Sequence, residues 1–313
     1  MATSGSVDYT LTAGEAIDQA FGKIGVKEAE QALQPDEMQD GLNVLNAFLK
    51  ALNTTGGHLW TQEEGILFLD KGKPSYNVGP TGDEATLLDD FIGTRTTAVL
   101  GTVAIIPVLS SAGMLSGDNV GVQLDDGTRF WTTILTVDNA LQITLSASLP
   151  SASTSNSTVF TYTNIIERPL RVSSFRRKTF GIDSEIIIGS WSRNQYFKQT
   201  NKESQGTVVN SYYSPLIGNG RLYVWQTASS VNDFVRFSFE RSIQDVNDKT
   251  NNLDLPPEWM ETLVYNIAAR LIDDYYVPPA KAAEIRGLAK NMLDNALGWD
   301  EEIESVFMQP DFQ

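Results

Sequence analysis

Apolar residues recur at helical spacing in the first part of the chain. They predict a helix that begins behind the capping-box residues Thr12 and Glu15 and ends at Gly25. A second helix is expected to begin at Pro35, because proline is tolerated at the first helical position, and to end near Asn53. We expect these two helices to pack as an antiparallel pair.

Two more helices are expected near the other end of the sequence. Pro257 opens the first of them, and the pair Pro278 and Pro279 separates it from the second. One face of the first carries Trp259, Leu263, Ile267 and Leu271. The residues expected to line the buried face of the second are Ala283, Ile285, Leu288, Met292 and Ala296.

Between the helical ends, short apolar runs predict β strands at 65–69, 76–78, 120–124, 130–134, 141–145, 186–188, 221–225 and 234–239. A hairpin is expected at Asp125-Asp126-Gly127, since Asp-Gly accommodates positive φ angles. A short helix is expected within 191–200. Residues 94–165 are rich in Ser and Thr and contain no Lys or Glu. This change in composition predicts a compact all-β insertion, either a barrel or a sandwich.

The pattern therefore predicts an α+β fold, in which the N- and C-terminal helices form a helical bundle and an all-β domain is inserted. The expected parts are an N-terminal helical part of the core (1–93), the inserted β domain (94–165), strands and C-terminal helices that complete the core (166–298), and a tail (299–313). The tail combines acidic with apolar residues, which is unusual for a solvated segment. Its expected partner-binding residues are Ile303, Val306, Phe307, Met308 and Phe312.

The charge balance argues against nucleic acid as a tightly bound ligand. The chain has 39 acidic and 23 basic residues and a net charge of -16, so most of its surface repels phosphate. It contains no cysteine, which excludes disulfides and suits assembly in a reducing cytoplasm. We find no apolar run long enough to span a membrane and no signal-peptide pattern at the start of the sequence.

No residue pattern indicates catalysis, a cofactor or a metal ion. The single histidine, His58, excludes a His-based metal site and a Ser-His-Asp triad, and we interpret it as a loop or core-edge residue. Adjacent carboxylates could support glycoside hydrolysis only if they faced each other across a cleft. These carboxylate pairs are Asp125-Asp126, Asp273-Asp274 and Glu301-Glu302. Asp118 with Asp125 and Asp126 does not match the spacing of an EF-hand calcium site.

A basic segment contains Arg168, Arg171, Arg176, Arg177 and Lys178. It could contact DNA phosphates, but we favour pairing with acidic residues of a neighbouring subunit, because few aromatic residues are interleaved with it. The sequence Tyr212-Tyr213-Ser-Pro predicts a loop that packs against a partner, since tyrosine is common at interfaces. The expected subunit-interface residues are Arg176, Arg177, Tyr212 and Tyr213.

Several short motifs occur in a characteristic order. They are the helix at 16–25 ending in Lys-Ile-Gly, the helix at 38–52 with Asp-Gly-Leu at 40–42, Gly-His-Leu-Trp at 57–60, Ser-Tyr-Tyr-Ser-Pro at 211–215, Leu-Tyr-Val-Trp at 222–225, Leu-Pro-Pro-Glu-Trp at 255–259, and the helix at 263–271. This series resembles the head-to-tail adaptors of podoviruses, the family that includes tubular tail protein A and the packaged-DNA stabilisation proteins. The resemblance covers the two ends and the central strands, and leaves out 94–165.

The resemblance implies a non-enzymatic subunit of the virion, without cofactor, located at the head–tail interface. About 12 copies would form a ring, with the portal protein above and tail nozzle or fibre proteins below, and double-stranded DNA would pass through the channel without specific binding. A second hypothesis is a carbohydrate-binding tail component whose β insertion holds a glycan near Trp131. A third, a glycosidase, needs a carboxyl pair in a cleft.

Overall fold

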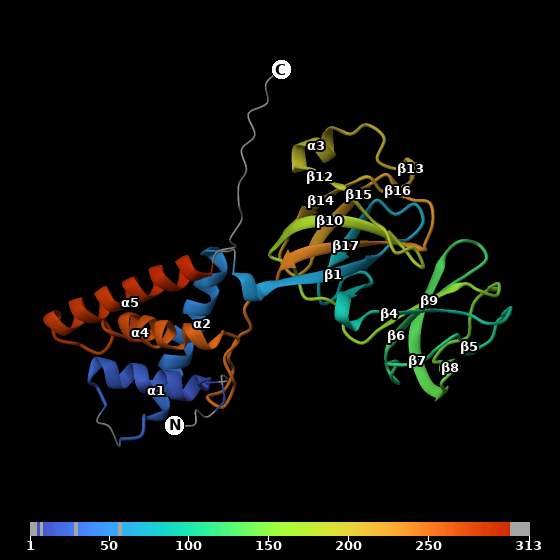
Figure 1. Ribbon diagram of the computed structural model, residues 1–313. Helices are drawn as coiled ribbons and strands as arrows, with labels where there is room; N and C mark the ends of the chain where they lie inside the picture. Colours follow the sequence, from blue (N-terminus) through green and yellow to red (C-terminus); the bar gives the residue numbers. More distant parts are fainter. Residues whose placement is uncertain (1–4, 7–8, 28–30, 56–57, 301–313) are drawn as a thin grey trace. The chain divides into compact units, whose positions relative to one another are not determined.

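The computed structural model describes residues 5, 6, 9–27, 31–55 and 58–300 of the chain. The fold is mixed α+β, as the sequence predicts, and the described residues form five α-helices and several β sheets (Figure 1). The chain divides into two compact units. Residues 1–61 and 242–313 make up the first, called here the helical unit, and residues 62–241 make up the second, the β unit.

These boundaries differ from the expected ones at 93/94 and 165/166. The strand at 62–68 pairs along its whole length with the strand at 233–240, so both belong to the β unit. Segments that the sequence assigned to a helical core therefore lie in the same unit as the predicted insertion.

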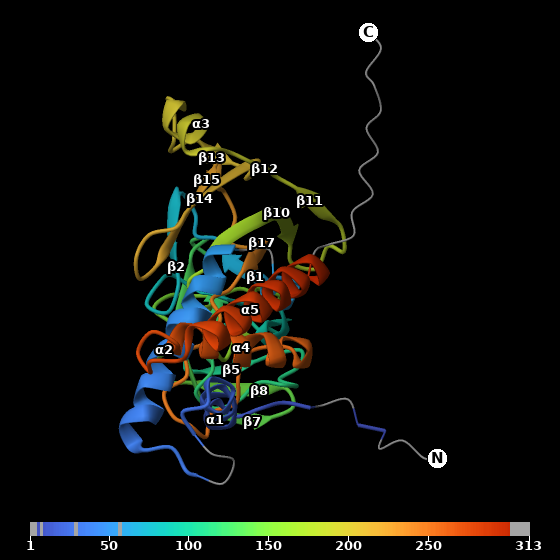
Figure 2. The same ribbon diagram turned by 90° about the vertical axis from the view of Figure 1, so that its left-hand side faces the viewer.

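The helical unit holds four α-helices and two short 3₁₀ helices within its described residues. They are α1 (Ala13–Ile24), α2 (Pro35–Thr55), η1 (Leu59–Thr61), η3 (Pro257–Trp259), α4 (Met260–Leu271) and α5 (Pro279–Trp299). Helix α4 packs closely on both α1 and α5. In Figure 1, α2 runs across the direction of α1, and in Figure 2, α1 is seen nearly end-on while α2 is seen from the side, so the expected antiparallel pair is wrong. The reason is that α1 packs mainly on α4, a helix more than 200 residues later in the sequence.

A glycine allows α1 and α2 to approach closely. A Cβ atom at Gly41 in α2 would overlap the Cγ2 atom of Ile17 in α1, and Ile17 is fully buried. The β-branched side chain of Ile17 has little freedom to move away. Gly41 is therefore a packing residue.

We expect Gly41→Ala to lower the free energy of unfolding by about 1 kcal/mol. Alanine gains about 1 kcal/mol of helix propensity over glycine, but overpacking a buried contact costs about 1–3 kcal/mol. Gly287→Ala in α5 is the matched control, because nothing lies within 4 Å of its Cβ position, and it should stabilise the chain. Urea titration measures both variants. Stabilisation by Gly41→Ala would contradict the close approach.

The segment that returns from the β unit, residues 242–256, runs along the helices and is called here the strap. It satisfies backbone groups that a helix start leaves unpaired. The amide of Ala13 donates to Asn251 O at 2.9 Å and that of Gly14 to Lys249 O at 2.8 Å. The Thr12 side chain accepts from the amide of Glu15 within the capping box, as the sequence predicts. The strap therefore completes the N-terminal cap of α1.

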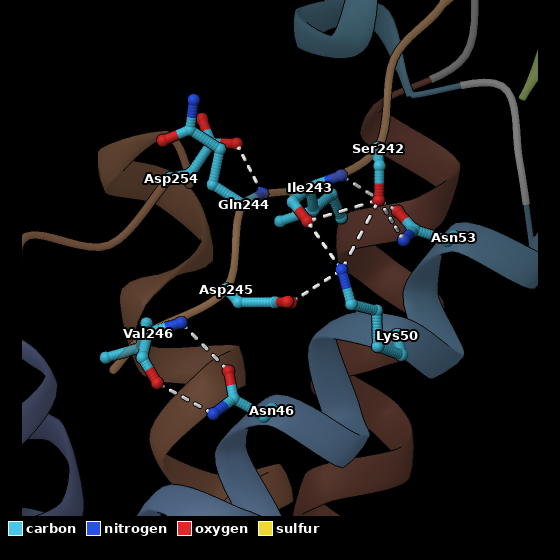
Figure 3. A network of polar contacts seen from close by, with 9 residues as sticks. All are labelled: Asn46, Lys50, Asn53, Ser242, Ile243, Gln244, Asp245, Val246 and Asp254. Atoms are coloured by element: carbon cyan, nitrogen blue, oxygen red, sulfur yellow. Dashed lines mark hydrogen bonds and ion pairs between the residues drawn. The ribbon is translucent and has the colours of Figure 1, made fainter. Parts of the chain in front are cut away.

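One polar face of α2 binds the start of the strap (Figure 3). Asn46, Lys50 and Asn53 are spaced by four and three residues and so share a helix face. The Asn46 amide group donates to Val246 O at 2.8 Å and accepts from Val246 N at 2.9 Å. Asn53 accepts from Ile243 N at 3.1 Å, and Lys50 donates to Ile243 O at 3.2 Å. These side chains replace the strand partner that the strap backbone lacks.

Two sheets of the β unit share one core and form a sandwich. The first has the strand order β11-β10-β17-β1-β3 and the second β12-β14-β15-β2. Leu67, Phe175 and Phe237 of the first sheet and Tyr76 and Leu222 of the second are buried in the same cluster. The strands are β1 (Gln62–Phe68), β2 (Ser75–Val78), β3 (Ala85–Leu87), β10 (Arg171–Thr179), β11 (Glu185–Ile187), β12 (Gly189–Ser190), β14 (Asn210–Ser214), β15 (Gly220–Trp225) and β17 (Asp233–Glu240).

Smaller elements complete the sandwich. The short helix α3 (Arg193–Lys198) contacts β14, close to where the sequence predicts a helix. Strands β13 (Gln205–Gly206) and β16 (Thr227–Ala228) pair with each other, and the 3₁₀ helix η2 (Leu88–Asp90) follows β3.

Residues 92–162 form a closed β barrel with strand order β4-β9-β6-β7-β8-β5. Closure comes from β4 and β5, because Thr97 N donates to Pro107 O at 3.0 Å and Leu109 N donates to Arg95 O at 2.9 Å. The predicted hairpin is present, and Gly127 in its turn has a φ of 80°. The strands are β4 (Ile92–Arg95), β5 (Ile105–Pro107), β6 (Asn119–Gln123), β7 (Arg129–Asn139), β8 (Gln142–Leu145) and β9 (Thr158–Tyr162).

Candidate interaction surfaces

His58 and Asp300 form a buried pair that fixes the end of α5. His58 Nδ1 lies 2.8 Å from Asp300 Oδ2, and Leu59 N donates to the other carboxylate oxygen at 3.2 Å. His58 Nε2 lies 3.2 Å from Leu52 O and 3.1 Å from the hydroxyl of Thr55. His58 is a loop residue, as interpreted from the sequence, but it is fully buried and not at the core edge. We call this pair the clasp, and it sits directly before residues 301–313.

Two tryptophans pack around the clasp. The ring of His58 lies 4.5 Å from that of Trp60 and 5.5 Å from that of Trp259, and the two indoles are 5.0 Å apart. Both indole N–H groups are buried with no hydrogen-bond partner among the described residues. The motifs at 57–60 and 255–259 thus meet in one aromatic cluster.

A groove beside Trp259 runs between α4 and α5. Its apolar residues include Met292 and Ala296, and Trp299 at its edge is 66% exposed. Glu258 and Glu261 also line it. The groove is therefore apolar with an acidic margin, which disfavours an acidic ligand.

The expected partner-binding residues of the tail, Ile303, Val306, Phe307, Met308 and Phe312, lie outside the described residues.

The predicted interface arginine Arg176 pairs with acids of its own chain. Its guanidinium binds Glu64 on β1 and lies 3.8 Å from Glu185 on β11. Lys178 and Arg236 also pair with Glu185. Arg176 therefore has acidic partners within its own chain, and one of them, Glu64, is 112 residues earlier in the sequence and is brought alongside by strand pairing. Its place in a subunit interface stays a prediction.

The other predicted interface residues have distinct environments. Arg177 lies opposite Val235 and Ile186 in the sheet and forms no ion pair within the described part of the chain. Tyr212 and Tyr213 belong to strand β14 and not to a loop, so that expectation is wrong. Because successive strand residues face opposite sides, Tyr213 packs on the sandwich core. Tyr212 instead stacks on Tyr223, with ring centroids 5.6 Å apart.

Aromatic side chains cover the outer face of the second sheet around α3. Trp191 stacks on Trp225 at 5.4 Å, and Tyr196 of α3 lies 4.7 Å from Tyr223. Phe197 is half exposed. Part-exposed aromatic rings of this kind are typical of contact surfaces between proteins.

The barrel exposes isolated large apolar residues on a surface with little charge. Leu115 and Leu135 lie close together, since the Ser116 hydroxyl bonds to Leu135 O at 2.7 Å, and Leu109 lies beside Leu141 through the bond from Val108 N. All four are exposed by more than half. Lys and Glu side chains are among those that lose the most conformational entropy when they are buried. Because residues 94–165 contain neither, covering this surface with a partner would cost little side-chain entropy. Single exposed apolar residues of this kind are common on protein surfaces and do not by themselves mark an interface.

No family model and no curated protein matches this sequence.

Several of the carboxylates that the sequence offers for metal binding or acid–base chemistry form hydrogen bonds or ion pairs within the chain. Asp118 is buried and accepts from Leu115 N and from the hydroxyl of Thr163. Asp126 accepts from the amide and hydroxyl of Thr128, and these hydrogen bonds lower its pKa. Asp273 pairs with Arg286. Among the described residues, no three His, Asp or Glu side chains are grouped closely enough to hold a metal ion, and no helix has the length and apolar character of a membrane span.

Trp131, near which the second hypothesis places a glycan, is part of the packing between barrel and sandwich. Its ring lies 5.1 Å from that of Phe68 in β1 and 5.8 Å from that of Tyr162. Arg129 nearby is buried, and its guanidinium lies 3.8 Å from the centre of the Phe160 ring and donates to Val231 O at 2.6 Å. Both side chains connect the barrel to the sandwich. The spacing of apolar residues in the sequence does not indicate these contacts.

Glu84 is a carboxyl group that titrates near neutral pH, and no sequence motif marks it. Burial, with a contribution from Asp70 and Asp83, raises its pKa to about 7. The hydroxyl of Tyr162 in the barrel donates to its carboxyl group. Because the folded-state pKa lies above the ordinary value of 4.5, the folded chain holds this proton more tightly than the unfolded chain. Stability from this group is therefore full below about pH 4.5 and is lost as the pH rises to about 7.

We expect Glu84→Gln to raise the urea midpoint at pH 8 and to change it little at pH 4.5. Glutamine keeps an oxygen for Tyr162 and removes the charge that burial disfavours. Glu203→Gln is the control, since Glu203 is exposed and should show no such pH dependence. An equal effect of Glu84→Gln at both pH values would contradict the raised pKa.

Proposed function

We propose that this chain is a structural head-to-tail adaptor subunit of a short-tailed phage. It forms a ring below the portal, retains the packaged DNA and provides the attachment platform for the tail. It acts through its surfaces and not through a catalytic site.

The observation that carries this proposal is where the adaptor-like motifs lie. Motifs at 16–25, 38–52, 57–60, 255–259 and 263–271 are far apart in the sequence, yet their apolar residues belong to one buried core. The two central motifs, at 211–215 and 222–225, pair as strands β14 and β15. Segments selected only by their resemblance to adaptors thus contact one another, which is expected if the resemblance reflects a common architecture.

We infer further that the helical unit is a bundle into which the β unit is inserted. The chain passes from one unit to the other only after Thr61 and again after Arg241. Gln62, at the start of β1, lies opposite Glu240, at the end of β17. In a ring, the helical unit would touch like units on both flanks through two different faces.

The charge of the chain supports a passage for DNA without specific binding. A net charge of -16 removes the counterion release that makes cationic surfaces adhere to DNA. Duplex binding at low salt should therefore be undetectable.

Mass measurement of the purified chain, alone and mixed with its portal protein, tests the proposal. We expect a stable complex with the symmetry of a closed ring, about 12 copies by resemblance. Particles assembled without the chain should lose their DNA and lack tails. Full retention of DNA and tails in such particles would refute the adaptor function, as would turnover of a substrate.

A glycan-array signal that is lost on Trp131→Ala would favour the carbohydrate-binding alternative.

A further inference from the structure

A pocket beside the outer face of the first sandwich sheet joins aromatic and cationic side chains. Its apolar surface comes from β1, β17, the start of the barrel and the turn after β10. The lining residues are Ile66, Phe91, Lys178, Phe180, Gly181, Ile182, Asp183, Phe234 and Arg236. Ile182 at this pocket is 51% exposed although it is a large apolar residue.

Positive charge exceeds negative charge around this pocket. Lys178 and Arg236 line it together with one acid, Asp183, and Arg95 lies against it, with its guanidinium 5.2 Å from the centre of the Phe180 ring. Arg95 donates only to carbonyl oxygens, those of Asn156 and Phe180, and has no carboxylate partner in the described ranges. Glu185 is shared between Lys178, Arg236 and Arg176.

Arg236 also keeps an unused donor at this pocket. Its Nε–H is buried and has no hydrogen-bond partner within the described residues. An unpaired buried donor costs about 1–3 kcal/mol, so a shift of the Arg236 side chain that brings this donor to a ligand carboxylate is favourable. In a chain with a net charge of -16, such a site selects an acidic ligand with apolar side chains.

We propose that this pocket binds residues 301–313 of an adjacent copy, an inference that rests on the proposed ring. This segment contains Glu301, Glu302, Glu304 and Asp311 and no basic residue. It also contains Ile303, Val306, Phe307, Met308 and Phe312. Its acids match the cations Lys178, Arg236 and Arg95, and its phenylalanines match the aromatic wall. A pocket and a complementary segment on the same chain are the two unlike surfaces that a closed ring requires.

The groove beside Trp259 is a weaker candidate for the same segment. The segment follows Asp300 of the clasp directly in sequence, but two acids, Glu258 and Glu261, line this groove. Like charges at an interface are repelled. Charge therefore directs the acidic segment to the pocket with Lys178 and Arg236.

The clasp determines where the chain should be cut to test this inference. A cut after Gly298 would also remove Asp300, the partner of His58, and so would unsettle α5. A cut after Asp300 removes the segment and keeps the clasp. A labelled peptide of residues 301–313 is then titrated against the chain cut after Asp300.

We expect the peptide to bind saturably and more weakly at high salt. Lys178→Ala and Ile182→Ser should each raise Kd at least tenfold, whereas Lys198→Ala and Ile217→Ser, at exposed positions away from the pocket, should leave it unchanged. Unfolding midpoints show that each variant is folded. Absence of binding, or equal binding by the pocket variants and their controls, would overturn the inference.

Mixing the cut chain with a full-length variant tests whether the contact joins two copies. The chain cut after Asp300 has a pocket and no segment, and the Lys178→Ala, Ile182→Ser double variant has a segment and a weakened pocket. Above the Kd of the peptide, their mixture should form dimers. A mixture that stays monomeric would overturn binding between copies. If the cut chain forms normal rings on the portal and binds no peptide, the inference fails while the adaptor function stands.

Discussion

Asp300→Ala should lower the free energy of unfolding of the helical unit by about 3 kcal/mol, since removing one partner of a buried polar pair leaves the other unsatisfied. Asp300 is the partner of both His58 Nδ1 and Leu59 N, and the side chains of His58 and Asp300 are 2% and 4% exposed. Hydrogen exchange should show the last turn of α5 opening more readily. Urea unfolding, followed by circular dichroism at 222 nm, measures the loss.

A second pair in the same unit provides the control. Asp273 and Arg286 also form a contact, but their side chains are 79% and 50% exposed. An exposed ion pair is worth at most about 1 kcal/mol, so Asp273→Ala should shift the urea midpoint only slightly. Similar losses for Asp300→Ala and Asp273→Ala would show that the clasp does not hold the end of α5.

Trp259→Ala should cost about 3–5 kcal/mol, the usual loss when a buried tryptophan is truncated. Trp259 is 1% exposed and packs against both His58 and Trp60. Its removal leaves a cavity bordered by residues from both ends of the chain, which cannot close without moving η3. The thermal midpoint of the helical unit should fall accordingly.

Trp299→Ala is the matched control, because Trp299 lies in the same unit and is 66% exposed. A surface substitution of this kind usually changes stability by less than about 0.5 kcal/mol. If the two tryptophan variants unfolded alike, the aromatic cluster around the clasp would contribute little to stability.

Local signals in the sequence predicted most of the elements. The capping box at Thr12, the left-handed Gly25 at the end of α1, Pro35 at the start of α2 and the Asp-Gly hairpin each act through a few neighbouring residues. Such signals specify where an element begins and ends. They also predict the all-β region, but they do not distinguish a barrel from a sandwich, because closure depends on hydrogen bonds between β4 and β5.

Contacts between distant segments could not be predicted in this way. His58 and Asp300 are 242 residues apart, and nothing near either residue indicates the other. The buried face of α5 is predicted only in part: Ile285 is buried and Met292 and Ala296 are half-buried, but Ala283 and Leu288 are exposed, and Ala282 and Ala289 are buried instead. This helix has small residues on several sides, so more than one of its faces could be the buried one. Packing against α4 determines which face is buried.

The ends of the β unit face each other across two adjacent strands, with Gln62 opposite Glu240 and Glu63 opposite Phe239. A tight reverse turn of a few residues could therefore bridge the two cut points if everything between them were removed. Because both ends of the β unit lie on neighbouring strands, residues could be added to it or removed from it without lengthening the connection between its ends.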